Sequence, residues 1–270
     1  MIITLIIGKN SNLSQHLKKK IVNSVLISSR EIQKDINILA PYKKQKINLI
    51  FNNFQSSTLL NSKGNSTEYI SNAIMTSAMV LDYFRGCSIN KIIYTSSSSV
   101  YGNNICCREY DEVKPLNLHA SLKIANEKLI EKYCEEENIN YTITRIFNMY
   151  GGNDTFSVIS KIIDANRKDK TITIVNQGNA IRDFIHVEDV VEIYKRALEG
   201  NVKILNIGSG EGISIKTLID FLALRDVQLK VKNIARSELK ISTADITVLK
   251  EITGFASFVR VQDYLKNELC

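Results

Sequence analysis

The chain has 270 residues, of which 44% are hydrophobic and 23% are charged, and its formal net charge at pH 7 is +7. This composition is typical of a globular protein with one large domain, or with a large and a small lobe. No apolar run approaches the roughly 18 residues that a membrane helix needs. The apolar start Met1–Ile7 lacks the basic region of a signal peptide. We therefore expect a cytoplasmic protein without membrane contact.

The positively charged side chains are dispersed along the chain, apart from the runs Lys18–Lys20 and Lys43–Lys44. No strip of interleaved aromatic and basic residues resembles a platform for single-stranded nucleic acid, so we expect no nucleic-acid partner. The five cysteines form no C-x-x-C pair, and the three histidines are scattered. These residues predict reduced thiols and no metal site.

Short β-branched runs alternate with longer runs of helical periodicity in the first half of the chain. The strand candidates are Ile2–Ile7, Ser24–Ser28, Ile47–Asn52, Lys91–Thr95 and Tyr141–Ile146. The helix candidates are Leu13–Val22, Glu68–Arg85 and Ala120–Glu136. Strands that alternate with helices predict an α/β fold, with a doubly wound parallel sheet and right-handed crossovers.

The pattern changes after about Gly151, where shorter elements follow one another. The candidates are helices over Ser157–Arg167, Glu188–Glu199 and Ile215–Leu224 and strands over Thr171–Val175 and Leu205–Ile207. We expect residues 1–150 to form the core domain, to which residues of about 176–206 return. Residues 151–270 are expected to form most of a smaller C-terminal α/β lobe.

The first strand ends at Gly8, and the segment Gly8–Ser14 leads into a helix. This is the position of a dinucleotide-binding turn, where glycines allow a tight turn and close approach to a pyrophosphate. Only Gly8 remains, because Ser11 and Ser14 occupy the other two positions, and serine resists positive φ. An ordinary strand–turn–helix is the alternative. The candidate cofactor residues of this region are Gly8, Ser11, Asn12, Leu13 and Asn52.

The second strand ends in Ser28, Ser29 and Arg30. An acidic residue at this point would bond the ribose 2′-hydroxyl of NAD, whereas an arginine suits the 2′-phosphate of NADP. The three residues therefore favour NADP, with NAD possible. The alternative is an arginine in a solvated loop.

Five later segments resemble, in order, the motifs of the extended short-chain dehydrogenase/reductases, the family of nucleotide-sugar epimerases, dehydratases and reductases. The segments are Tyr94–Gly102, Arg145–Gly151, Arg182–Val191, Leu205–Ser214, and Ala244-Asp245 with Leu249 and Gly254-Phe255. Their order and spacing fit from Met1 to about residue 265. The resemblance implies a Rossmann-type fold with a substrate lobe.

The resemblance also implies roles for particular side chains. Ser97 lies where the family bonds the reacting sugar oxygen, and Lys123 where it holds the nicotinamide ribose. The implied substrate contacts are Ser98, Asn148, Arg182 and Arg236. The spacing around Arg236 differs from that of the family by about one residue. Two alternatives remain open, since the serine run could be only a turn and Arg182-Asp183 only a local ion pair.

His119 replaces the tyrosine that the family places four residues before the lysine. An imidazole has an unperturbed pKa near 6.5, so it can serve as an acid or a base, and nearby Lys123 would disfavour the imidazolium. The other interpretation is that the proton relay is lost. Of the remaining histidines, His16 is expected on the surface and His186 as a packed structural residue.

The resemblance implies an NAD(P)-dependent enzyme that reduces a 4-keto nucleotide-linked hexose or epimerises a nucleotide-sugar, in the synthesis of surface polysaccharide. The alternative is a catalytically impaired protein of the same fold that binds a nucleotide or nucleotide-sugar. The resemblance also implies a homodimer, in which helices Glu68–Arg85 and Ala120–Glu136 pack as a four-helix bundle.

Overall fold

The structure is a computed structural model that describes residues 1–52, 66–254 and 257–270. Phe255, part of the last motif, lies outside the described residues. The chain divides into two compact units. The first comprises residues 1–100, 115–145 and 194–205, and the second comprises residues 101–114, 146–193 and 206–270. Residues 194–205 lie within the expected returning segment of about 176–206.

The central sheet has six strands in the order β2-β1-β3-β4-β5-β9. Their bounds are β1 Ile3–Ile7, β2 Ser24–Ile27, β3 Ile47–Phe51, β4 Ile89–Ser97, β5 Asn140–Ile146 and β9 Ile204–Ile207. The sheet is parallel, which confirms the predicted α/β fold class. The register aligns Ile3 of β1 with Ile47 of β3.

The strand order is that of the flavodoxin-like doubly wound sheet, in which β1 is flanked by β2 on one side and β3 on the other. The chain thus reverses its winding direction between β1 and β3. The two strands end together, since the backbone N–H of Asn52 donates to the carbonyl of Ile7 at 2.8 Å. Ligands of such sheets bind outside the carboxyl ends of the strands at this switch point.

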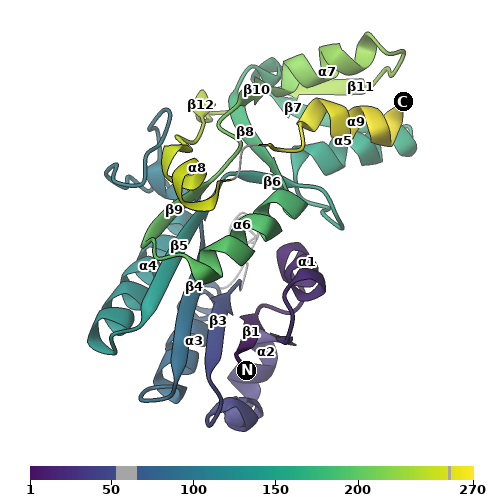
Figure 1. Cartoon of the computed structure of the whole chain (residues 1–270). Helices are drawn as coiled ribbons and strands as arrows, with labels where there is room; N and C mark the ends of the chain where they lie inside the picture. The colour runs from purple at the N-terminus through teal and green to yellow at the C-terminus, as the bar shows by residue number, and fades with distance from the viewer. Residues whose placement is uncertain (53–65, 255–256) are drawn as a thin grey trace. The chain divides into compact units, whose positions relative to one another are not determined.

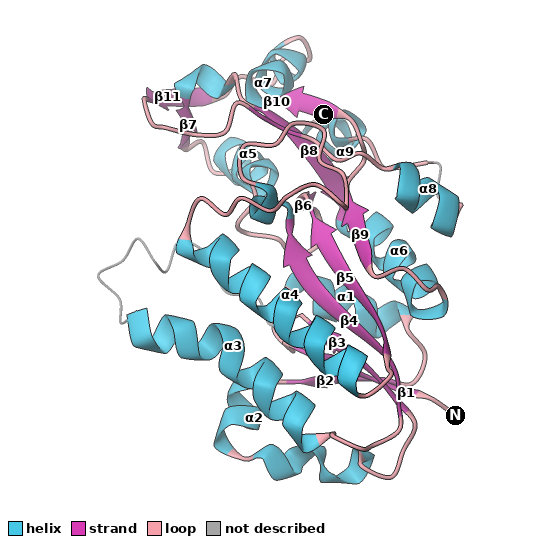
Figure 2. Ribbon diagram, turned by 90° about the vertical axis from the view of Figure 1, so that its left-hand side faces the viewer, coloured by secondary structure: helices cyan, strands magenta, loops and turns pink. Residues whose placement is uncertain are grey.

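Helices cover both faces of this sheet (Figures 1 and 2), with α3 and α4 packed against each other on one face and α1 on the other. The helices of this part of the chain are α1 Asn12–Lys20, α2 Ser29–Lys34, α3 Ser66–Tyr83 and α4 Leu118–Glu136, with 3-10 turns η1 Ile36–Tyr42 and η3 Ser98–Tyr101. The predicted strands and helices of the first half are confirmed to within two residues. One expectation is wrong: His16 is only 8% exposed, because the turn of α1 that carries it packs inward.

The second unit contains shorter strands and its own apolar core. Its strands are β6 Asn148–Tyr150, β7 Thr171–Val175, β8 Ile181–His186, β10 Gly212–Ser214, β11 Lys230–Ile234 and β12 Ile241–Ser242. Its helices are α5 Val158–Arg167, α7 Ile215–Ala223, α8 Thr247–Thr253 and α9 Val261–Leu269, together with the 3-10 turn η4 Asn176–Gly178, while α6 Val187–Glu199 leads back to the first unit. Strand β8 pairs with β6, β10 and β12, so it is the centre of this unit.

Candidate functional site

The turn after β1 runs from Gly8 into the N-terminus of α1. Gly8 has φ +108°, a value that side chains disfavour. Ser11, by contrast, has φ −74° and is the N-cap of α1, where its hydroxyl oxygen accepts from the backbone N–H of Ser14 at 3.0 Å. The second glycine position therefore needs no positive φ in this chain, and serine is a favourable N-cap.

Asn52 joins the end of β3 to this turn. Its amide Nδ2 donates to Oγ of Ser11 at 2.6 Å and to Oγ of Ser14 at 2.9 Å. The Ser11 hydroxyl in turn donates to Oγ of Ser14 at 2.9 Å. The two hydroxyls thus hold the turn at the switch point. The first turn of α1 contains Asn12 and Leu13, and a helix N-terminus has the partial positive charge that favours an anion.

No carboxylate follows the end of β2 directly. Ser28 is extended and precedes α2, whose first turn contains the exposed Arg30. The nearest acidic residues are Glu31, one position further, and Asp35, whose carboxylate accepts from the backbone N–H of Asn37 at 2.9 Å and so caps η1. The segment after β2 therefore begins with two serines and a guanidinium.

His119 and Lys123 lie on one face of α4, because residues four apart in a helix are neighbours. The helix begins after Asn117, whose side chain accepts from the backbone N–H of Ala120 at 2.9 Å. The buried Lys123 donates from Nζ to the carbonyl of Thr95 at 2.8 Å, which anchors it beside the end of β4. Burial lowers the pKa of Lys123 to about 8, against an opposing effect of Glu127.

His119 is half-buried and contacts a residue that the sequence did not single out. Its ring nitrogen Nδ1 lies 3.1 Å from the hydroxyl of Tyr69 on α3. Burial, and then the charge of Lys123, lowers the pKa of His119 to about 4, so the imidazole is neutral at pH 7. The two side chains border a cavity of about 20 Å³. The residues that line it are Tyr69, Ala73, Tyr94, His119, Leu122, Lys123 and Asn126.

The neutral state of His119 predicts a specific effect of acid on stability. Because the imidazole is harder to protonate in the folded protein (pKa about 4) than at its ordinary value of 6.5, acid favours the unfolded chain. The free energy of unfolding should therefore decrease as the pH falls from 6.5 to 4, and His119→Gln should reduce this decrease. Chemical denaturation at pH 7 and pH 4.5 measures the difference. Identical decreases in the two proteins would contradict a buried neutral imidazole.

The serines at the end of β4 form a turn, and two of their hydroxyls form hydrogen bonds. Ser97 is the last residue of β4, two positions after Thr95, and its Oγ accepts from the backbone N–H of Ser99 at 3.2 Å. Ser98 begins the 3-10 turn η3. The neighbouring Ser96 is buried and donates to the carboxylate of Glu127. The end of β4 is thus fixed from α4 by both Lys123 and Glu127.

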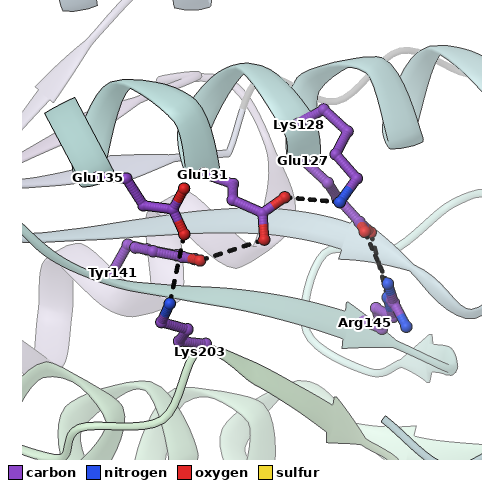
Figure 3. Close-up of polar contacts among 7 residues, drawn as sticks. All are labelled: Glu127, Lys128, Glu131, Glu135, Tyr141, Arg145 and Lys203. Carbon is purple, nitrogen blue, oxygen red and sulfur yellow. Dashed lines mark hydrogen bonds and ion pairs between the residues drawn. The ribbon is translucent and has the colours of Figure 1, made fainter. Parts of the chain in front are cut away.

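Glu127 forms a buried ion pair that sequence reasoning missed. Its Oε2 lies 2.8 Å from the guanidinium of Arg145 on β5, and both side chains are 5% exposed. A second bond joins Oε1 to Nε of Arg145 at 3.3 Å, and Figure 3 shows the pair bridging α4 and β5. The only signal was its spacing, since Glu127 lies four residues after Lys123 on the same helix face.

The three remaining candidates lie in the second unit, on or near β6, β8 and β11. Asn148 donates from Nδ2 to the carbonyl of Asp183 at 2.9 Å. Arg182 pairs with Glu238 at 3.2 Å, so the alternative of an ion pair with Asp183 is wrong. The exposed Arg236 is held through its backbone, whose carbonyl accepts from the side chain of Asn176 at 2.6 Å.

The buried carboxylate of Asp183 instead accepts hydrogen bonds from backbone N–H groups of other segments. Its carboxylate accepts from the N–H and hydroxyl of Ser209, from the N–H of Gly210 and from the N–H of Ala244, at 2.7 to 3.1 Å. These four bonds connect three of the motif segments. The Arg182 side chain pairs with Glu238 and not with Asp183. The arginine is thereby oriented by local contacts.

The structure adds three further facts about ligands and partners. The five cysteines, all of which lie among the described residues, are thiols. Among the described residues, no three or more His, Cys, Asp and Glu side chains gather in a way that could hold a metal ion. No helix in the part of the chain that the structure describes is long and apolar enough to cross a membrane.

Comparison with known families gives a match over most of the chain. The model of the NAD dependent epimerase/dehydratase family matches residues 9–208. The chain belongs to this family. An uncharacterised protein of Methanocaldococcus jannaschii is 28% identical over 234 residues, which cover 83% of this chain and 72% of that relative. A putative UDP-glucose 4-epimerase of the same organism is 33% identical over 150 residues, which cover 53% of this chain and about half of the relative, 49%.

Solved structures of the epimerase/dehydratase type share the fold. UDP-glucuronic acid 4-epimerase from Bacillus cereus, in complex with UDP-glucuronic acid and NAD, superposes with a TM-score of 0.84 at 22% identity, covering 100% of this chain and 98% of that one. UDP-glucose 4-epimerase from Thermus thermophilus, in complex with NAD, gives a TM-score of 0.87 at 16% identity, covering 100% and 98%. These likenesses confirm the Rossmann-like architecture of this member of the family.

Proposed function

We propose that this epimerase/dehydratase family member is a cytoplasmic NADP(H)-dependent enzyme that reduces a 4-keto nucleotide-linked hexose or epimerises a nucleotide-sugar, for surface-polysaccharide synthesis. One observation carries the proposal. His119 and Lys123 share a face of α4, and Lys123 is bonded to the carbonyl of Thr95, two residues before Ser97. An imidazole, an ammonium and a hydroxyl are the groups that proton transfer at a sugar oxygen requires.

The residues of the first unit fit a dinucleotide. Gly8 at positive φ and the N-terminus of α1 suit a pyrophosphate, and the switch point between β1 and β3 is where such ligands bind. The bound cofactor supplies the hydride that is exchanged with the sugar carbon. Lys123, with three donor protons and one bond to Thr95, has donors left for the hydroxyls of the nicotinamide ribose.

His119 and Ser97 act at the sugar oxygen. The Ser97 hydroxyl oxygen accepts one backbone bond from Ser99 and keeps its proton to donate to the reacting oxygen. His119 exchanges the proton that this oxygen gains or loses when the hydride is transferred. A neutral imidazole suits this role because one ring nitrogen carries a proton and the other accepts one.

Three further residues are proposed contacts of the nucleotide end of the substrate. Arg182 has a planar guanidinium that suits a diphosphate, and its pairing with Glu238 holds it in place before the substrate binds. Asn148 and Arg236 add an amide and a second positive charge. A homodimer through α3 and α4 belongs to the same proposal, supported by the exposed Ile70 and Met75 on α3.

NADP preference depends on Arg30. Replacement of Arg30 with alanine should weaken NADP binding about 10- to 150-fold, because a charge-assisted bond to a 2′-phosphate contributes about 1.5–3 kcal/mol, and should leave NAD binding unchanged. Titrations followed by nicotinamide fluorescence measure both affinities. Lys34→Ala, which removes a positive charge from the other end of α2, is the matched control. Equal weakening of NADP and NAD, or tighter binding of NAD than NADP by the natural chain, would overturn the preference.

The function itself is tested with the same titration followed by a single-turnover assay. The protein is mixed with one equivalent of NADPH or NADH and a 4-keto nucleotide-sugar, and loss of nicotinamide fluorescence is followed. Transfer supports the enzyme. Tight binding of nucleotides without transfer from any keto-sugar favours the second candidate, a binding protein without turnover, which the replacement of the family tyrosine by His119 motivates.

A further inference from the structure

Tyr69 is a buried phenol whose hydroxyl contacts the ring of His119. It lies in the first turn of α3 and is 7% exposed, whereas its neighbours Glu68 and Ile70 are exposed. The oxygen of Tyr69 lies 3.1 Å from Nδ1 of His119, across a separation of 50 residues in sequence. This contact joins α3 to α4 beside Lys123, which lines the same cavity.

The contact determines which ring nitrogen carries the proton. Burial raises the pKa of Tyr69 above its ordinary value of 10.0, and His119 is neutral, so one group must donate and the other accept. A phenol is a stronger acid than a neutral imidazole, and an imidazole nitrogen is a stronger base than a phenol oxygen. Tyr69 therefore donates to Nδ1, and the proton of His119 lies on Nε2.

We propose that Tyr69 is a positioning residue that holds His119 as the Nε2–H tautomer and supplies a proton to Nδ1 as Nε2 releases one to the sugar oxygen. The inference rests on the proposed function. In this proposal a phenol again takes part in the proton transfer, although position 119 itself is a histidine. Tyr69 and His119 then deliver a proton to the sugar through two proton transfers, where a single phenol would need one.

The proton transfer balances in the direction of reduction. As hydride adds to the keto carbon, the π electrons of the C=O bond move onto oxygen. The Nε2–H bond of His119 breaks and an O–H bond forms on the sugar, while the O–H bond of Tyr69 breaks and an Nδ1–H bond forms. His119 stays neutral throughout, and Tyr69 is left as a phenolate near the ammonium of Lys123.

The cavity offers a path by which the phenolate regains its proton. Its volume of about 20 Å³ is enough for one water molecule. Asn126 lines it and donates from Nδ2 to the carbonyls of Ala73 and Leu122, at 3.0 Å each, while its Oδ1 is buried without a hydrogen-bond partner. A water that entered this cavity would be within the lining that Asn126 and Tyr69 share, where Oδ1 could accept from it. The other titratable groups that border it are Tyr94 and Lys123.

The test replaces Tyr69 with phenylalanine and measures both the tautomer of the His119 ring and the single-turnover rate. In ¹⁵N-labelled protein, the natural chain should show His119 protonated on Nε2, and Tyr69→Phe should shift the ring toward the other tautomer. The single-turnover reduction should slow about 10- to 100-fold, less than the 10²- to 10⁴-fold contribution of a general acid, because His119 itself remains. The solvent deuterium isotope effect on this single-turnover rate should also differ between the natural chain and Tyr69→Phe. Tyr83→Phe on the same helix is the matched control and should match the natural chain in rate.

The double variant Tyr69→Phe/His119→Tyr should recover the rate, because the phenol then lies at position 119 itself. Unchanged tautomer and rate in Tyr69→Phe would overturn the relay. Loss of transfer in His119→Ala with full transfer in Tyr69→Phe would leave the proposed function intact and remove only Tyr69. If the natural chain transfers no hydride, the proposed function fails, and the ¹⁵N measurement still decides whether Tyr69 sets the tautomer.

Discussion

Replacing His119 with alanine is expected to slow hydride transfer in a single turnover about 10²- to 10⁴-fold, the contribution of a positioned acid or base. The methyl group offers no proton to the nascent sugar alkoxide, and Tyr69 loses the ring that it contacts at 3.1 Å. His119→Tyr should retain transfer, because a phenol at this position lies four residues before Lys123, as in the family. Rapid mixing with NADPH and a keto-sugar measures the rates.

Two observations control this experiment. Lys128→Ala removes an exposed charge from the same helix and should transfer hydride at the natural rate. Nucleotide affinity should be unchanged in His119→Ala, because the phosphate turn belongs to β1 and α1. Full transfer by His119→Ala, with normal folding, would show that the proton comes from another group.

Replacing Glu127 with alanine is expected to lower the free energy of unfolding by about 3–5 kcal/mol, because it leaves Arg145 buried without its carboxylate. The loss includes the bond from Ser96, so the end of β4 loses one of its two anchors on α4. Urea denaturation measures the change. The double variant Glu127→Met/Arg145→Met should recover much of the stability, since it removes both charges.

The matched control for Glu127 is Glu135 on the same helix. Its ion pair with Lys203 spans 3.4 Å and both side chains are more than half exposed, so Glu135→Ala should cost no more than about 1 kcal/mol. Figure 3 shows the two glutamates on one helix, with their partners on β5 and on the segment before β9. Similar losses for the two variants would contradict the account of the buried pair.

The sheet and its main helices could be predicted because their patterns are local. Buried parallel strands such as β3 are nearly continuous apolar runs, and the long helices α3 and α4 carry helical periodicity. Strand β8 was not predicted, because Arg182 and Asp183 at its start interrupt the apolar pattern. The polar residues lie there for contacts with Glu238 and with backbone of two other segments.

The candidate site was predictable only where a motif carried it. Lys123 and Ser97 followed from motif positions, whereas Tyr69 and Glu127 act through contacts with residues distant in the chain, which no spacing shows. The effect of Ser11 also depended on the backbone. Its negative φ, unknown from the sequence, explains why serine replaces glycine at this point without strain.

The most direct test of the proposed hydride transfer uses NADPH labelled with deuterium at the reactive nicotinamide carbon and measures deuterium transfer to a 4-keto nucleotide-sugar. The protein and both ligands are mixed in equal amounts, and the sugar product is analysed by mass spectrometry. The proposed enzyme predicts one deuterium in the sugar, far less of it with His119→Ala, and its return with His119→Tyr. An unlabelled sugar from protein that binds both ligands would contradict the account.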